Sequence, residues 1–236
     1  MKKLVIGDIC SRAWDLAVKH WLVFVIISLV SALIGVGIQH FSNPNLPVDF
    51  GQNPDPKVLV ELYKSLFFDP FFILSCFISW YFSLVVYRMA VNVLRTGKPY
   101  ASLSEVFNVG LKRYFVFACV SLIYLILVFT GSILCILPGI FLCVRLTFVP
   151  LAVAADNVGF GEAFSRSWNM TKGNFWNLFL LGLTAIGIAL LGFCACCVGV
   201  FFAAVIVNFM LALAYFELKD DDQPENMEEA VEVVEP

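Results

Sequence analysis

Histidine and cysteine are the residues of this chain that could bind metal or do redox chemistry, but their spacing does not favour either. His20 and His40 stand at opposite ends of the first apolar stretch, so they cannot share a metal ion. Three of the eight cysteines, Cys194, Cys196 and Cys197, form a C-A-C-C run that lacks the paired C-x-x-C spacing of zinc and dithiol sites. The sequence has no H-E-x-x-H, G-x-S-x-G or Walker loop. We therefore expect no catalytic residue, no metal and no cofactor.

One charged residue, Arg145, lies deep in an apolar stretch. It follows Ile133 by twelve positions, or about 18 Å at the rise of an α-helix. An unpaired cation at that depth costs at least ~2.5 kcal/mol, so a partner or a water-filled cavity is expected. Asn208 lies about 15 Å into the last apolar stretch, and we predict that the two side chains make an intramembrane polar contact. Two roles remain open for Arg145: it reaches the headgroups past a kink at Pro150, or it contacts an anion or lipid headgroup inside the bundle.

A short motif occurs twice. Residues 11–15 (S-R-A-W-D) recur as 165–169 (S-R-S-W-N), and in both copies an aromatic residue follows the Trp by seven positions. Phe107 and Tyr114 keep the same spacing. We interpret the unit as an amphipathic helix followed by a transmembrane hairpin, present three times. The candidate interfacial residues are Ser11, Arg12, Trp14, Asp15, Ser165, Arg166, Trp168 and Asn169.

Helical periodicity supports the amphipathic parts of these units. The predicted apolar faces are Ile6, Ile9, Ala13 and Ala17 in the first unit, and Phe160, Ala163, Phe164 and Trp168 in the third. The second begins with Ser102-x-x-Glu105, a pattern typical of a capping box. Such helices either lie among lipid headgroups or pack as a collar against the ends of the spans, and both alternatives remain open.

The elements that position these residues are membrane helices. Hydrophobic residues make up 61% of the 236-residue chain and charged residues only 14%, which is too apolar for a soluble domain of this size. Six stretches approach the about 20 residues that a spanning helix needs. They are Trp21–Ile38, Pro70–Val91, Tyr114–Thr130, Ile133–Ala155, Phe175–Phe193 and Val198–Phe216. The predicted fold is therefore all-α: a polytopic membrane protein with six transmembrane helices, built as three repeats of amphipathic helix plus transmembrane hairpin.

Two further features bear on how the spans pack. Pro138 and Pro150 interrupt the fourth span, so kinks are expected there. Small residues allow helices to approach closely, and we expect this packing within one molecule. They occur in Ser31-x-x-x-Gly35, in Gly199-x-x-x-Ala203, and at Gly182, Gly187 and Gly192.

The distribution of Lys and Arg predicts the orientation. Thirteen of these residues fall on the side that holds the N-terminus, segments 88–113 and 145–172, and Lys219, whereas only Lys57 and Lys64 fall on the other. The first side is therefore predicted to be cytoplasmic, with both termini there. Segment 39–69 is then an outer loop, with a short amphipathic helix in its second half.

The C-terminal segment is strongly acidic. From Glu217 onward there are nine acidic residues and the single Lys219. We predict a six-helix transmembrane domain over residues 1–217 and a disordered acidic tail over 218–236. The tail is a candidate docking sequence for a cytoplasmic protein. Membrane lipids are the other expected partners, and no nucleic acid is expected.

Residues 140–180 resemble a known family. The residues that carry the resemblance are Arg145 and Pro150, then Asp156, Gly159, Glu162, Ala163, Arg166, Ser167 and Trp168, then Lys172 and Gly173. This pattern resembles the membrane domain found beside glycerophosphoryl diester phosphodiesterases and the YciC-like bacterial inner-membrane proteins. The resemblance implies a six-helix protein of the bacterial plasma membrane, mostly of unassigned activity, and we do not carry a phosphodiesterase activity over to this chain.

Two classes of function remain. The first is a non-enzymatic membrane module that organises lipid or a partner protein. The second is a small transporter or lipid-translocating protein with Arg145 lining the path. A transporter of the common kind has inverted repeats, whereas all the repeats here enter from one side, which favours the module.

Overall fold

The computed structural model of the protein describes residues 5–42, 70–99, 107–134, 136–194 and 196–221. Within these ranges the chain is almost entirely α-helical and has no strand. Six helical segments of the described residues are long and apolar enough to cross a membrane, which confirms the predicted all-α, multi-pass fold. The helices are α1 (Ile6–Ser42), α3 (Pro70–Thr96), α5 (Leu111–Leu134), α6 (Ile136–Arg145), α7 (Val149–Asp156), α8 (Phe160–Met170), α9 (Phe175–Cys194) and α10 (Cys196–Asp221).

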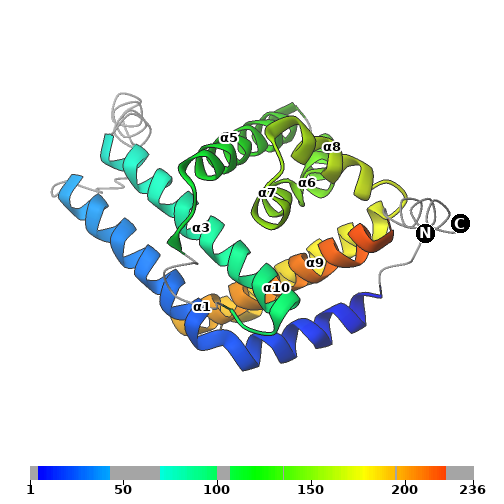
Figure 1. Ribbon diagram of the computed structural model, residues 1–236, viewed down its shortest axis with the longest axis horizontal. Helices are drawn as coiled ribbons and strands as arrows, with labels where there is room; N and C mark the ends of the chain where they lie inside the picture. The colour runs from blue at the N-terminus through cyan, green and yellow to red at the C-terminus, as the bar shows by residue number, and fades with distance from the viewer. Residues whose placement is uncertain (1–4, 43–69, 100–106, 135, 195, 222–236) are drawn as a thin grey trace, which may run out of the picture.

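Helix α1 runs without a break from the predicted amphipathic segment into the first span. The expected start of the span at Trp21 is not a helix end, because no glycine or proline stands between residues 8 and 34. Figure 1 shows that α1 bends along its length rather than stopping. In its first part Ile9, Ala13 and Ala17 are fully buried, so the predicted apolar face is confirmed.

The fourth span consists of two helices, α6 and α7, separated by a turn at residues 146–148. Pro150 lies in the first turn of α7 and Pro138 in the first turn of α6. A proline fits at these positions because its missing N–H has no partner to lose in the first turn. The predicted break near Pro150 is confirmed, and it falls just before that residue. The interruption predicted at Pro138 is not found, because Pro138 stands in the first turn of α6, and Ile133, the predicted start of this span, lies in α5.

Helix α7 occupies the centre of the bundle. It packs against α3, α5 and α8, and it lies inside the ring of other helices in Figure 1. Its buried residues are Val149, Leu151, Ala152, Val153, Ala154 and Ala155. Because nearly the whole helix is packed on all sides, the position of its last residue, Asp156, is held firmly by the surrounding helices.

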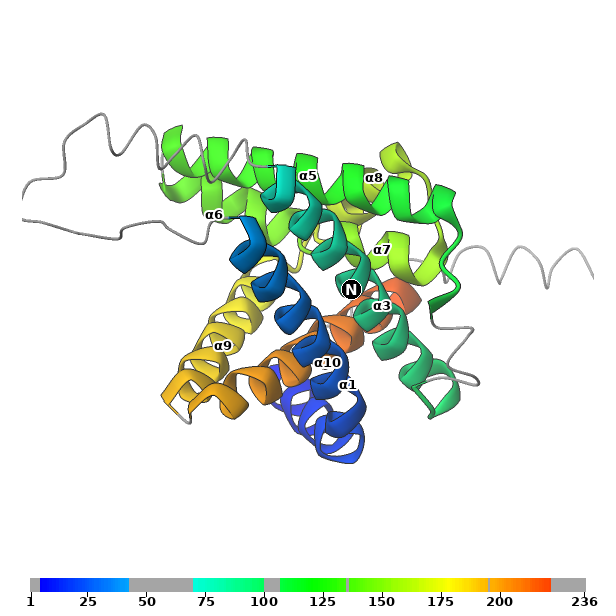
Figure 2. The same ribbon diagram turned by 90° about the vertical axis from the view of Figure 1, so that its left-hand side faces the viewer.

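Two helical hairpins have close contacts at glycine. A Cβ at Gly192 of α9 would lie 2.6 Å from Ala203 Cβ and 2.7 Å from the Gly199 carbonyl oxygen of α10. A Cβ at Gly139 of α6 would lie 2.8 Å from Ser132 Cα of α5. In Figure 2, α5 and α6 run side by side, whereas α9 and α10 open from their connection. The close packing predicted at Gly192 and Gly199 thus occurs within one molecule, whereas it is absent at Gly35, Gly182 and Gly187, where an added Cβ would have nothing within 4 Å.

Helix α8 differs in part from its predicted face. Its buried residues are Ala163, Ser167 and Met170. Phe160 and Trp168, which we expected on the apolar stripe, are exposed. Small side chains let α8 approach α7 closely, and the large aromatic groups therefore remain at the margin of the contact.

Several predicted features lie outside the described residues. These are most of the outer loop 39–69, the helix start at 102–105 and the acidic tail beyond residue 221. Helix α10 includes residues 218–221, which we predicted to belong to the disordered tail, and Leu218 is buried.

Candidate functional site

A carboxylate, Asp156, stands at the end of α7, where the fourth span meets α8. The next residue, Asn157, has a left-handed φ of 56°, which asparagine tolerates better than most residues, and its N–H donates to the Val153 carbonyl. The chain then turns to Gly159, the N-cap of α8. Only 11% of the Asp156 side chain is exposed, so the turn delivers a carboxylate that is largely removed from water.

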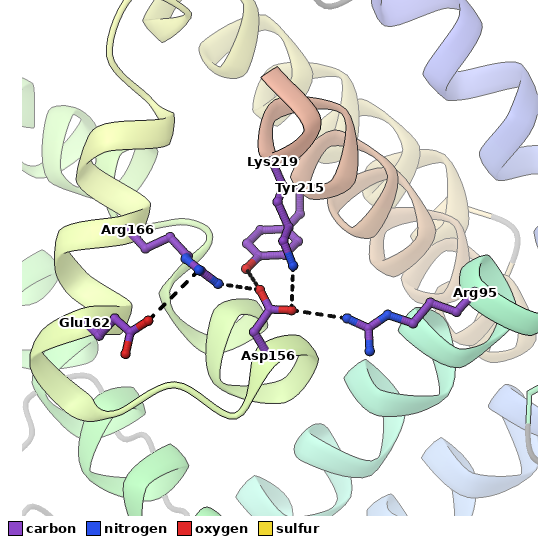
Figure 3. Close-up of polar contacts among 6 residues, drawn as sticks. All are labelled: Arg95, Asp156, Glu162, Arg166, Tyr215 and Lys219. Atoms are coloured by element: carbon purple, nitrogen blue, oxygen red, sulfur yellow. Dashed lines mark hydrogen bonds and ion pairs between the residues drawn. The ribbon is translucent and has the colours of Figure 1, made fainter. Parts of the chain in front are cut away.

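Four side chains from three other helices donate to the two oxygens of Asp156 (Figure 3). Arg95 Nη2 of α3 lies 3.1 Å and Lys219 Nζ of α10 lies 2.8 Å from Oδ1. Arg166 Nη1 of α8 and Tyr215 Oη of α10 donate to Oδ2, the tyrosine over 2.7 Å. Each oxygen thus accepts two charge-assisted hydrogen bonds. We call these five residues the Asp156 cluster.

The Asp156 cluster carries more positive than negative charge. Arg95, Arg166 and Lys219 bring three cations to one carboxylate, and the largely exposed Glu162 lies 4.0 Å from Arg166. Burial works against the Arg166 charge, but the neighbouring Tyr215 hydroxyl and the two carboxylates outweigh it, so the pKa of the guanidinium lies above its ordinary value. Separation of α3, α8 or α10 from α7 would leave the buried carboxylate without some of its donors, which is unfavourable. The cluster therefore holds these four helices together.

A second ion pair fastens α1 to the same end of the bundle. Arg12 Nη1 lies 2.8 Å from Glu217 Oε1 of α10 and 3.6 Å from Asp8 of its own helix. Glu217 stands two residues from both Tyr215 and Lys219. Five helices therefore bring charged groups together at one end of the bundle, which we call the charged end.

Two cavities share a residue beside the Asp156 cluster. The first, the arginine cavity, has a volume of about 140 Å³. Its lining includes Arg88, Asn92, Arg95, Arg113, Ala154 and Ala155. The second cavity, of about 400 Å³, is lined in part by Lys112, Arg113, Asn157 and Gly159. The described lining of the two cavities includes four cations and no carboxylate.

The Asp156 cluster and both cavities lie within residues 72–220, and this segment, more than half of the chain, matches a model described as a domain of unknown function (DUF7847). The chain belongs to the DUF7847 family. No curated protein and no solved structure matches it. The DUF7847 match gives no link to the phosphodiesterase membrane domain or to the YciC-like proteins, so that resemblance stays a hypothesis.

Within the DUF7847 segment, Arg145 is held between two aromatic rings. Its guanidinium carbon lies 5.3 Å from the ring centroid of Phe141 and 5.0 Å from that of Trp168. Nη1 donates to the Trp168 carbonyl over 3.3 Å and to Thr171 Oγ1 over 3.4 Å. The Arg145 carbonyl in turn accepts from Ser167 Oγ over 2.8 Å. The expected partners of this cation therefore exist, and α8 and α6 supply them.

Asn208 lies in different surroundings, contrary to the prediction that it meets Arg145. Its Nδ2 donates to the Ala204 carbonyl of its own helix over 2.8 Å. It lines a third cavity, of about 260 Å³, whose polar residues are Ser28, Ser31, Ser83, Tyr87 and Asn208. The two residues stay apart because α6 packs against α5 and α9, whereas α10 packs against α1, α3 and α9. Equal depth in the bilayer does not make two helices neighbours.

The two copies of the repeated motif make parallel contacts. Arg12 and Arg166 each pair with a carboxylate at the charged end. Trp14 packs edge-on against Phe202 at 5.6 Å between ring centroids, and Trp168 packs edge-on against a ring of α6. The other motif residues are exposed: Ser11, Asp15, Ser165 and Asn169.

Sequence reasoning missed the Asp156 cluster in this DUF7847 chain. Asp156 was named only among the residues that carry the family resemblance, with no predicted contact, and Lys219 was predicted to lie in the tail. A usable signal exists, because Asp156 is the sole acidic residue between positions 106 and 161 and it follows an apolar span on the side with most of the cations. In the described part of the chain, His, Cys, Asp and Glu side chains do not gather in threes as a metal site would need.

Proposed function

We propose that this protein is a non-enzymatic, multi-pass membrane module that organises anionic lipid at its charged end. The observation that carries the proposal is the excess of cations there. Six described cations gather near four described carboxylates: Arg12, Arg88, Arg95, Arg113, Arg166 and Lys219 against Asp8, Asp156, Glu162 and Glu217. Anionic lipids attract such juxtamembrane cations by roughly 1 kcal/mol for each residue near the surface.

Exposed aromatic side chains support the same proposal. Trp14 of α1 and Phe160 and Trp168 of α8 are exposed on helices that contribute cations to the charged end, and Trp176 is exposed in the first turn of α9. Trp rings are enriched at the level of lipid headgroups, where one part of the ring is in contact with acyl chains and the N–H reaches water. Aromatic groups and cations of the charged end therefore lie on the same two helices, α1 and α8.

The state of Asp156 favours a structural over a catalytic role. A general base needs a lone pair that can accept a proton from a substrate. Both oxygens of this carboxylate already accept two hydrogen bonds each. Asp156 thus orders the cations around it, and we assign it no step in a reaction.

We further propose that the protein lies in a bacterial plasma membrane with the charged end facing the cytoplasm. Support comes from the thirteen-to-two division of Lys and Arg and from the ion pairs that join the basic segments at one end. Fusions of a periplasm-active phosphatase at residue 98 and at residue 57 test this. Activity at residue 57 alone is expected, and activity at residue 98 would reverse the orientation.

The proposed function is tested by extracting the full chain with its native lipids in polymer nanodiscs and measuring lipids and proteins by mass spectrometry. We expect enrichment of anionic phospholipid over the bulk membrane. A lipid content equal to that of the bulk membrane would refute lipid organisation. A stoichiometric protein, lost when residues 222–236 are removed, would instead make the chain a docking module for a partner.

A second candidate function, transport, has its own observation. The cavity lined by Ser28, Ser31, Ser83, Tyr87 and Asn208 lies between three spans and could bind an uncharged polar solute. Transport by this route predicts that Asn208→Leu abolishes solute uptake into vesicles while the protein still assembles. Equal uptake with and without the protein would remove this candidate.

A further inference from the structure

We propose that the arginine cavity and the second cavity together bind a phosphate-bearing anion, with Arg88, Arg95 and Arg113 as the phosphate ligands. The inference deepens the proposed function, on which it rests, by naming a site and a ligand chemistry. A phospholipid headgroup and a free phosphate compound share that chemistry, and the experiment below distinguishes them.

The first step is the geometry of α3 and α7. Arg88, Asn92 and Arg95 are spaced by four and three residues, so they share one face of α3. On the other side α7 presents Ala154 and Ala155, whose small side chains leave the space open. The resulting volume of about 140 Å³ accommodates several water molecules, and therefore a tetrahedral oxyanion.

The second step is the charge that the structure leaves uncompensated. Asp156 pairs with Arg95, but its two oxygens also accept from Arg166, Tyr215 and Lys219, so one carboxylate charge is shared among three cations. Arg113 makes no ion pair with any described residue, and its Nε is buried without a hydrogen-bond partner there. A buried donor without a partner is destabilising, and a phosphate oxygen would relieve that cost.

The third step is the type of cation. Guanidinium groups present a planar fork of N–H donors that matches two phosphate oxygens at once, which an ammonium group cannot do. Three such groups from two helices line one cavity, and Asn92 adds an amide. This composition favours phosphate over a diffuse attraction for any anion.

The second cavity provides for the rest of the ligand. It shares Arg113, adds Lys112, and reaches the turn at Asn157 that follows Asp156. Helix α5 begins at Leu111, so the positive end of its dipole also lies beside this cavity. Its volume of about 400 Å³ leaves room for the glycerol or other polar part of a headgroup.

The test uses the full chain in nanodiscs of phosphatidylcholine with a defined fraction of phosphatidylglycerol, and native mass spectrometry counts the bound lipids. We expect one phosphatidylglycerol per chain to be retained, and Arg113→Gln to weaken its binding about tenfold or more. Arg88→Gln should weaken it in the same direction and serves if Arg113→Gln does not assemble. Lys172→Gln removes an exposed cation outside both cavities and should change binding less than twofold.

A second arm adds inorganic phosphate to nanodiscs of phosphatidylcholine alone. Phosphate that raises the unfolding temperature of the wild type, but not of Arg113→Gln, assigns the site to soluble phosphate compounds. Lipid binding without a phosphate effect assigns it to phospholipid. Wild-type affinity in both arginine variants, or an equal loss in Lys172→Gln, would overturn the site and leave lipid organisation standing. No preference of the wild type for phosphatidylglycerol would remove the proposed function itself.

Discussion

Replacing Asp156 by asparagine removes the charge on which the Asp156 cluster depends while keeping the size of the side chain. The amide can still accept hydrogen bonds at one oxygen, but its NH₂ group faces donors that the second oxygen had satisfied. Arg95, Arg166 and Lys219 are then left close together without a carboxylate between them. We expect Asp156→Asn to loosen the contacts of α3, α8 and α10 with α7.

The size of the effect follows from burial. Breaking one side of a buried ion pair costs about 3–5 kcal/mol, whereas exposed pairs contribute about 0–1 kcal/mol. The carboxylate is 11% exposed, but Arg95 is 46% exposed and Lys219 is 22% exposed, so water recovers part of the lost interaction. We therefore expect the free energy of unfolding to fall by about 2–3 kcal/mol.

The assay is equilibrium unfolding of the full chain in mixed micelles with rising dodecyl sulfate, followed by tryptophan fluorescence. Glu162→Gln is the matched control, because Glu162 is exposed and lies 4.0 Å from Arg166, so its loss should cost less than about 0.5 kcal/mol. A double variant with Lys219→Met should lose less than the sum of the two single variants, since the partners are coupled. If Asp156→Asn unfolds like the wild type or like Glu162→Gln, the cluster does not hold the helices together.

Three further predictions test other contacts. Arg145→Lys keeps the charge but loses the planar group between two rings, and it should lower the free energy of unfolding by about 1 kcal/mol in the same micelle assay. Gly192→Leu overfills the contact of α9 with α10 and should cost about 1–3 kcal/mol or more, whereas Gly187→Leu meets open space and should leave the melting temperature within a degree or two. Arg12→Gln breaks the exposed pair with Glu217 and should cost only about 0.5 kcal/mol, measured with the same titration.

The spans were predictable because their signal is local. A run of about 20 apolar residues carries its own evidence for a membrane helix, and each of the six predicted runs overlaps a span of the described residues. The fourth run is the least accurate, because it begins within α5 and is divided into α6 and α7. The break before Pro150 was also predictable, since proline restricts its own backbone and that of the preceding residue. The apolar face of the first amphipathic segment followed from its periodicity in the same way.

The candidate site was not predictable, because it depends on which helices become neighbours. Equal depth suggested a contact between Arg145 and Asn208, but α6 and α10 do not pack as a pair. Asp156 meets donors 61 residues before it and 63 residues after it, and no local pattern links those positions. Lys219 was misassigned because an acidic segment follows it, although its helix continues to Asp221.

The four donors of Asp156 become available in a fixed order during synthesis of the chain. A chain made from the N-terminus places Arg95 before Asp156 and Arg166 shortly after it, while Tyr215 and Lys219 arrive only with the last span. During synthesis at most two of the four donors are therefore available to the carboxylate until α10 is inserted. A chain truncated before residue 215 lacks Tyr215 and Lys219, so Asp156 would have only two of its four donors. Insertion of the last span is therefore the step that completes the cluster.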